Sequence, residues 1–112
     1  MTAITTHVLD LSRGRPARGI PVMLERVGTP QSTTLARATT DADGRIKAFT
    51  PTPVLQVGTY RLTFAVDAYF AAAGVEAFYP RVVVEFEVRD AAQHHHVPLL
   101  LSPYGYSTYR GS

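Results

Sequence analysis

The sequence HHHVPLLLSPYGYSTYRGS, at residues 94–112, predicts a β-hairpin at the end of the chain. A run of three leucines is followed by the turn-forming residues SPYG, and then by tyrosine and threonine, which favour strands. Because side chains alternate between the two faces of a strand, His94 and His96 share a face with Pro98 and Leu100. Proline has no N–H to offer a neighbouring strand, so we expect a bulge or an unpaired position at Pro98.

Alternating apolar and polar residues indicate further strands upstream of the hairpin. The expected strands are residues 4–9, 20–27, 33–40, 59–66 and 81–88, with a short strand starting at Arg45. The sequence DADG at 41–44 is a strong turn signal, since its glycine tolerates positive φ. One short helix is expected at about residues 67–73, with Asp67 as its N-cap and Gly74 after its end. Seven to eight closely spaced strands and one helix predict an all-β protein, an antiparallel β-sandwich.

Length and composition exclude several classes of protein. The 112 residues fit a single domain, residues 1–112, and the lack of cysteine excludes disulfides, thiolate metal sites and a cysteine nucleophile. No signal peptide and no membrane-spanning apolar run is visible, so we expect a cytoplasmic protein with no membrane partner. The net charge is +2, and the arginines are scattered among acidic residues, which argues against nucleic acid as a partner.

Three segments carry a resemblance to a known family: HVLD at 7–10, GRPA at 14–17 followed by Ile20-x-Val22, and the terminal hairpin. Together they resemble the transthyretin (prealbumin) family, and the ending YRGS at 109–112 resembles its enzymatic branch, the 5-hydroxyisourate hydrolases. The resemblance implies a transthyretin-like sandwich that assembles as a homotetramer, a dimer of dimers, with a channel between the dimers. It also implies that the last residues are ordered and form a wall of the site.

The activity implied by the resemblance is the hydrolysis of 5-hydroxyisourate, the product of urate oxidation, to 2-oxo-4-hydroxy-4-carboxy-5-ureidoimidazoline. A neutral imidazole, from His7 or His96, takes a proton from the attacking water, and Arg45 stabilises the oxyanion. Which histidine is the base stays open, and neither a metal nor another cofactor is expected. The alternative is a non-enzymatic carrier of a small ligand, for which the imidazoles and phenol in the channel are too polar.

The site residues that the resemblance implies fall into three groups. The catalytic residues are His7, Arg45 and His96; the substrate-binding residues are His7, Arg45, Tyr109, Arg110 and Ser112; and His94 is a supporting residue. Arginine suits substrate binding at position 45 because its planar guanidinium can hold neighbouring acceptors of an oxidised purine in two hydrogen bonds. Ser112 offers a hydroxyl group and, at the chain end, a carboxylate.

The chemistry of these residues also allows other interpretations. His94 and His96 could form half of a metal site, with His7 as a further ligand, but the family resemblance implies chemistry without a metal. His95 stands where the family usually has an aromatic residue, and alternation directs it away from its two neighbours. Asp41 and Asp43 are explained by turn formation, since no calcium loop of EF-hand length follows them.

Overall fold

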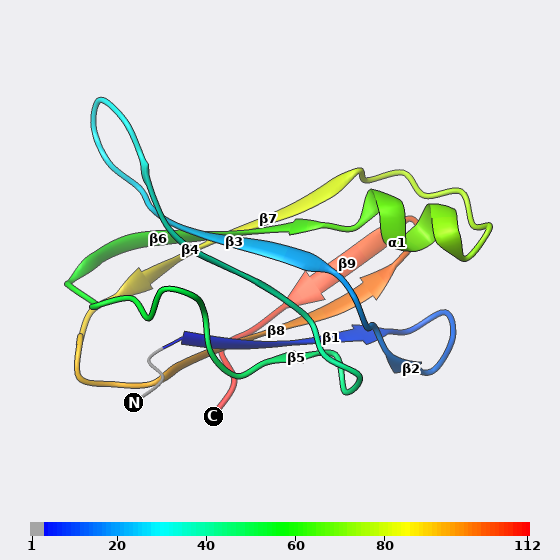
Figure 1. Cartoon of the computed structure of the whole chain (residues 1–112), viewed down its shortest axis with the longest axis horizontal. Coiled ribbons are helices and arrows are strands. Elements are labelled where there is room, and N and C mark those ends of the chain that lie inside the picture. Colours follow the sequence, from blue (N-terminus) through cyan, green and yellow to red (C-terminus); the bar gives the residue numbers. More distant parts are fainter. Residues whose placement is uncertain (1–3) are drawn as a thin grey trace.

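The computed structural model describes residues 4–112, and residues 1–3 of the predicted domain lie outside that range. Two β-sheets face each other, and one short helix lies at an end of the sandwich (Figure 1). The elements are β1 (Ile4–Asp10), β2 (Arg15–Pro16), β3 (Pro21–Arg26), β4 (Thr33–Thr39), β5 (Arg45–Ile46), β6 (Gly58–Ala65), α1 (Asp67–Ala72), β7 (Arg81–Val88), β8 (His95–Ser102) and β9 (Gly105–Thr108). The predicted all-β sandwich with one short helix is confirmed. The described residues contain two strands of only two residues, β2 and β5, and β2 was not expected.

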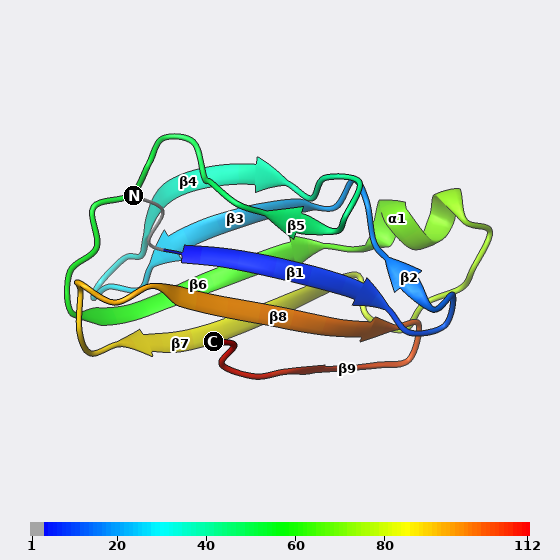
Figure 2. The same ribbon diagram turned by 90° about the horizontal axis from the view of Figure 1, so that it is seen from below.

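The strand order explains how the ends of the chain meet. One sheet has the order β4-β3-β6-β7, and the other has the order β2-β1-β8-β9, with β5 also paired to β1. All of these pairs are antiparallel except β1 and β8, which run parallel (Figure 2). Alternation within a strand says nothing about the direction of its neighbour, so the parallel pair could not be seen in the pattern. Its consequence is that the opening strand lies against the closing hairpin.

Alternation then decides which side chains reach the outer face. In β1 every second residue from Ile4 to Asp10 is buried, whereas Thr5, His7 and Leu9 are only half-buried. The core is formed by large apolar side chains of both sheets, among them Val8, Leu24, Tyr60, Leu62, Phe64, Val82, Leu99 and Leu101. The outer face of the β1–β8 pair is therefore free to carry polar groups.

One local prediction needs correction, and another holds in one of its two alternatives. The N-cap of α1 is Val66 and not Asp67, which is the first helical residue and accepts a hydrogen bond from the Ala68 amide. The cause is that the buried alternation of β6 continues to Val66, so the helix starts directly after that core residue. At Pro98 the β1–β8 register runs on without a bulge, but Pro98 is unpaired on the β9 side, as the second alternative predicted, because the β8–β9 ladder starts at Leu99.

The turn before β5 is confirmed, and Gly44 is essential to it. Gly44 has a φ of 73°, and its amide donates to the Asp41 carbonyl oxygen at 2.9 Å. A Cβ at Gly44 would lie 2.4 Å from the carbonyl oxygen of Val8. Glycine therefore lets the turn approach β1 closely, and the Val8 amide donates to the Gly44 carbonyl oxygen at 2.7 Å.

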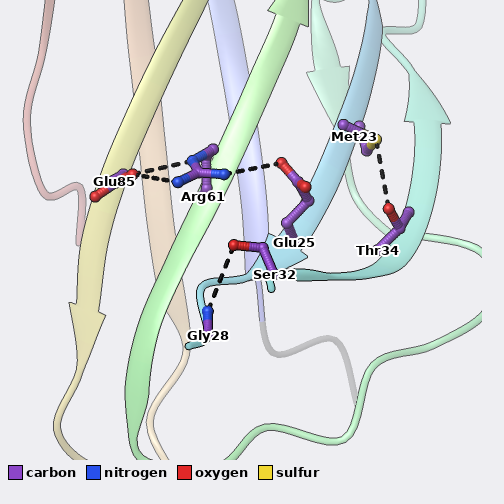
Figure 3. A network of polar contacts seen from close by, with 7 residues as sticks. All are labelled: Met23, Glu25, Gly28, Ser32, Thr34, Arg61 and Glu85. Carbon is purple, nitrogen blue, oxygen red and sulfur yellow. Dashed lines mark hydrogen bonds and ion pairs between the residues drawn. The ribbon is translucent and has the colours of Figure 1, made fainter. Parts of the chain in front are cut away.

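An ion-pair network lies on the outer face of the other sheet. Arg61 on β6 contacts Glu85 on β7 at 2.7 Å and Glu25 on β3 at 3.5 Å (Figure 3). Solvent screens exposed pairs of this kind, so the network is a minor part of the stability. Within residues 4–112, no helix has the length and apolar character needed to cross a membrane.

Candidate active site

Strand pairing brings the predicted site residues together from three segments. The parallel register places Thr5 opposite His96 and His7 opposite Pro98. On the other edge of β1, the antiparallel register places Arg45 of β5 opposite His7. Residues that are far apart in the sequence therefore share one outer face of the five-stranded sheet.

A cleft of about 370 Å³ opens on this face. Its lining residues are Thr5, Thr6, Asp43, Arg45, Ile46, Lys47, His94, His96 and Ser112. Four of the predicted site residues, Arg45, His94, His96 and Ser112, thus meet in one place. Sequence reasoning missed Lys47 as a site residue, although its position two residues after Arg45 on a short extended segment was a usable signal.

His7 lies beside this cleft and is held by the DADG turn. Its Nε2–H donates to the backbone carbonyl oxygen of Asp43 at 2.9 Å, so in the neutral ring the lone pair is on Nδ1. His7 is not one of the residues that line the cleft of a single chain. The positive charge of a protonated His7 would nevertheless lower the pKa of His96.

His96 has the electrostatic character of a neutral base. Partial burial lowers its pKa first, and the positive charge of Arg45 and the neighbouring His94 and His7 lower the pKa further. A hydrogen bond with the backbone of Thr5 raises the pKa of His96 and so acts in the opposite direction. Since an unperturbed imidazole titrates at about 6.5, a lowered pKa leaves His96 unprotonated at neutral pH.

The hydroxyl group of Thr5 connects two imidazoles. Thr5 Oγ1 lies 2.8 Å from Nε2 of His94 and 2.8 Å from Nδ1 of His96. The two rings are 6.3 Å apart between centroids. Thr5 was not among the predicted site residues, although its place in β1, two residues before His7, puts it on the same face.

The end of the chain is ordered, as predicted. The Gly111 amide donates to the carbonyl oxygen of His96 at 2.8 Å and forms a bridge next to the start of β8. This pairing turns Ser112 into the cleft. Gly111 is therefore paired with the sheet, and Ser112 contributes to the cleft.

Tyr109 and Arg110 lie elsewhere in the single chain. Both line a separate groove of about 260 Å³ on the β7–β9 side, together with Glu85 and His95. The Arg110 guanidinium donates to Gln93 Oε1 at 3.1 Å. One chain does not bring these two predicted residues into the cleft, and His96 is the predicted site residue that lines both hollows.

His95 points away from the cleft, as predicted. Its ring is buried in the sandwich, with its centroid 6.4 Å from that of Phe86. Burial, and secondly the charge of Arg110, lower the pKa of His95. A third imidazole therefore takes no direct part in the site.

Two other possibilities for a site are weaker. Within residues 4–112, no three side chains of the His, Cys, Asp and Glu type come together as a metal site. A larger hollow of about 700 Å³, between the β1–β2 turn and α1, is lined by Arg13, Arg15, Arg18 and Tyr69. It holds no imidazole or carboxylate that could move a proton near neutral pH, so the smaller cleft is the better candidate for catalysis.

The fold and the site together define a transthyretin-like β-sandwich with a polar cleft of imidazole, guanidinium and hydroxyl groups. The chain belongs to the HIUase/Transthyretin family, whose sequence profile matches residues 4–111. A 5-hydroxyisourate hydrolase of Caulobacter vibrioides is 47% identical over 116 aligned positions, covering 100% of both chains. A probable 5-hydroxyisourate hydrolase of Caenorhabditis elegans is 46% identical over 110 residues, covering 98% of this chain and 82% of the relative.

Solved structures agree with this membership. The 5-hydroxyisourate hydrolase of Klebsiella pneumoniae is 45% identical, with a TM-score of 0.84, covering 97% of this chain and 98% of that one. Sea bream transthyretin in complex with thyroxine has a TM-score of 0.90 at 27% identity, covering 97% of this chain and 94% of that one. The fold is thus shared by both kinds of protein, and the sequence is more similar to the hydrolase.

Proposed function

We propose that this chain is an enzyme that hydrolyses 5-hydroxyisourate to 2-oxo-4-hydroxy-4-carboxy-5-ureidoimidazoline. The observation that carries the proposal is the convergence of Arg45, His96 and Ser112 on one cleft, with His7 beside it. The relatives that are 45–47% identical over nearly the whole chain bear the name of this activity. The cleft supplies the groups that opening a cyclic amide requires.

The reaction needs a base, a charge-stabilising group and a proton donor. A neutral imidazole takes a proton from water while the water oxygen bonds to a ring carbonyl carbon. The Arg45 guanidinium, with Lys47 nearby, stabilises the oxyanion that develops on the carbonyl oxygen. When the carbon–nitrogen bond breaks, the imidazolium returns its proton to the leaving ring nitrogen, and a carboxylate remains. These steps use only side chains of the protein, so the mechanism is proposed to be independent of a metal or another cofactor.

We propose that Tyr109 and Arg110 bind substrate at the cleft of a second copy of the chain, in a homotetramer. The outer strands β7 and β9 are sheet edges, and exposed edges are normally paired or covered. Tyr109 is 57% exposed in the single chain, beside the edge strand β9. A homotetramer built from paired dimers would cover these edges and bring substrate-binding residues of a second copy to the cleft. Light scattering should give the mass of four chains; a monomer at working concentration would contradict the assembly.

The cytoplasmic location stays a prediction.

A carrier function is less well supported. Sea bream transthyretin holds thyroxine on the same fold. In this chain, however, the cleft is lined by charged and polar groups, including Arg45, Lys47, His94 and His96. A pocket for an apolar ligand is lined mostly by hydrophobic and aromatic side chains.

A spectroscopic assay tests the proposed activity. Urate oxidase generates 5-hydroxyisourate from urate, and the ultraviolet band of this unstable compound decays slowly without a catalyst. Adding the protein should accelerate the decay in proportion to its concentration, and heat-denatured protein should not. A decay rate equal to the spontaneous one would contradict the function.

A further inference from the structure

Among residues 4–112, Thr5 is the one residue whose side chain lies at hydrogen-bond distance from two imidazoles of the cleft. Both of its contacts, to Nε2 of His94 and Nδ1 of His96, are 2.8 Å long. The parallel pairing of β1 and β8 fixes this arrangement, because Thr5 is the register partner of His96. The tautomers that this contact selects do not depend on the proposed function, whereas their effect on kcat rests on it.

A hydroxyl group has one hydrogen atom, and this limits the states of the two rings. When Thr5 donates to one of the two nitrogens, it accepts a hydrogen bond from the other; if it donated to neither, it would accept from both, and the two rings would be in different forms. If Thr5 donates to His96, both rings carry their proton on Nε2, and His96 has no free lone pair toward the cleft. If Thr5 donates to His94, both rings carry their proton on Nδ1, and Nε2 of His96 is a free base.

Of the two states in which Thr5 links the rings as both donor and acceptor, only the second is compatible with proton uptake by His96. When Nε2 of His96 takes a proton, its Nδ1–H continues to donate to Thr5, and no hydroxyl group has to turn. In the first state, His96 would have to lose its hydrogen bond with Thr5, or both hydrogen bonds of Thr5, to His94 and to His96, would have to reverse direction. A partner that fixes the tautomer of a catalytic imidazole orients it in the same way as the partner of a metal-bound histidine.

We propose that Thr5 is a positioning residue that holds His96 and His94 in their Nδ1–H forms and thereby assigns His96 Nε2 as the general base. His94 is the acceptor of the Thr5 hydroxyl hydrogen and must stay neutral for this. Protonated His94 would donate to Thr5. If the Thr5 hydroxyl then donated to Nδ1 of His96, both hydrogen bonds would be reversed and the proton of His96 would be on Nε2. The other charged or titratable groups are Asp43, Arg45, Lys47 and Ser112, which line the cleft, and His7 beside it; of these, Arg45 and His7 act electrostatically on His96.

The first test needs no variant and no substrate. Long-range proton–nitrogen NMR of the intact protein at neutral pH reports which nitrogen of each histidine carries the proton. The proposal expects His94 and His96 both in the Nδ1–H form. Finding both in the Nε2–H form, or finding the two rings in different forms, would overturn it whatever the activity of the protein is.

The second test compares Thr5→Val, which removes the hydroxyl group at similar shape, with Thr5→Ser, which keeps it. Thr5→Val should lower kcat about 10- to 100-fold, the range found when such a supporting partner is removed, with a much smaller change in KM. It should also release His96 from the fixed Nδ1–H form and shift the pH dependence of kcat. Thr5→Ser should retain the wild-type tautomers and pH profile. A folded Thr5→Val protein with wild-type kcat, tautomers and pH profile would overturn the proposal. A wild-type protein inactive on 5-hydroxyisourate would instead overturn the proposed function and leave the NMR test in force.

Discussion

Gly111 lies so close to His96 that no side chain fits between them. A Cβ built at Gly111 would be 2.5 Å from Cδ2 and 3.2 Å from Cγ of the His96 ring. At the same time the Gly111 amide is bound to the His96 carbonyl oxygen at 2.8 Å. The chain end therefore holds both the backbone and the ring of the proposed base, and glycine is required here by proximity and not by its φ angle.

Replacing Gly111 with alanine should displace the imidazole of His96. We expect kcat to fall about 100-fold, since a shift of about 1 Å in a reacting group costs that much. The free energy of unfolding should change by less than about 1 kcal/mol, because the ring can move toward the open cleft and no core contact is lost. Steady-state kinetics and urea unfolding measure the two effects.

Gly105→Ala is the matched control for that substitution. Gly105 is also in the terminal hairpin, and a Cβ there would meet nothing within 4 Å. This variant should keep the activity and stability of the wild type. Equal activity of the Gly111→Ala and Gly105→Ala proteins would show that His96 is not positioned by the chain end.

Single replacements of the three proposed catalytic residues should separate chemistry from folding. His7→Asn, Arg45→Lys and His96→Asn each remove a group on the outer face of the sheet and leave the core intact. We expect kcat/KM to fall by about 10²- to 10⁴-fold, the contribution of a positioned base or an oxyanion donor. Circular dichroism should show folded proteins, and near-normal rates in all three would refute the assignment.

Arg45→Lys is the most informative of the three because it keeps the positive charge. A guanidinium can donate two parallel hydrogen bonds to a planar acceptor, whereas an ammonium acts as a point charge. If planar recognition matters, Arg45→Lys should lose nearly as much activity as Arg45→Ala. Full activity of the lysine variant would mean that charge alone is sufficient.

The sequence allowed much of the fold to be predicted because alternation and turn signals are local. The strands, the DADG turn and the opposite orientations of His95 and His96 follow from the period of two and from the tolerance of glycine for positive φ. The parallel pairing of β1 and β8 depends on contacts across about 90 residues, which no local pattern contains.

The site was predictable to the extent that it depends on which face a residue occupies. Arg45, His94, His96 and Ser112 do line one cleft. The bridging role of Thr5 and the lining position of Lys47 depend on registers between strands, and the separate groove of Tyr109 and Arg110 depends on how the chain end bends after β9. These relationships require the three-dimensional arrangement.

Gly44→Ala should cost more stability than an ordinary replacement of a positive-φ glycine. Gly44 (φ 73°) and Gly14 (φ 65°) share a backbone conformation that costs alanine about 1–2 kcal/mol. Only at Gly44 would the new Cβ meet backbone, the Val8 carbonyl oxygen at 2.4 Å, whereas Gly14 has open space. We expect Gly14→Ala to lose only the backbone term and Gly44→Ala to lose at least about 1 kcal/mol more, measured by urea unfolding. Equal losses would contradict the close approach.

The buried His95 gives the protein a dependence of stability on pH. Its buried Nδ1 has no hydrogen-bond partner among residues 4–112, and burial lowers the pKa of His95 below the usual value of about 6.5. Between the lowered pKa and about 6.5, the unfolded chain binds a proton that the folded chain does not. Stability is therefore complete above about pH 6.5 and is lost, at about 1.4 kcal/mol per pH unit, as the pH falls toward the folded-state pKa.

His95→Phe should remove the pH-dependent contribution of His95 to stability. The contribution of His96, whose pKa is also lowered, should remain. At pH 7.5 the variant should be more stable by about 1 kcal/mol, because an unpaired buried nitrogen is replaced by an aromatic carbon beside Phe86. The difference from the wild type should widen near pH 5, because only the wild type carries the cost of the lowered His95 pKa. Urea unfolding at both pH values and at one protein concentration measures it, since assembly would make stability depend on concentration. A difference that is the same at both pH values would mean that His95 does not titrate differently in the folded and unfolded chains.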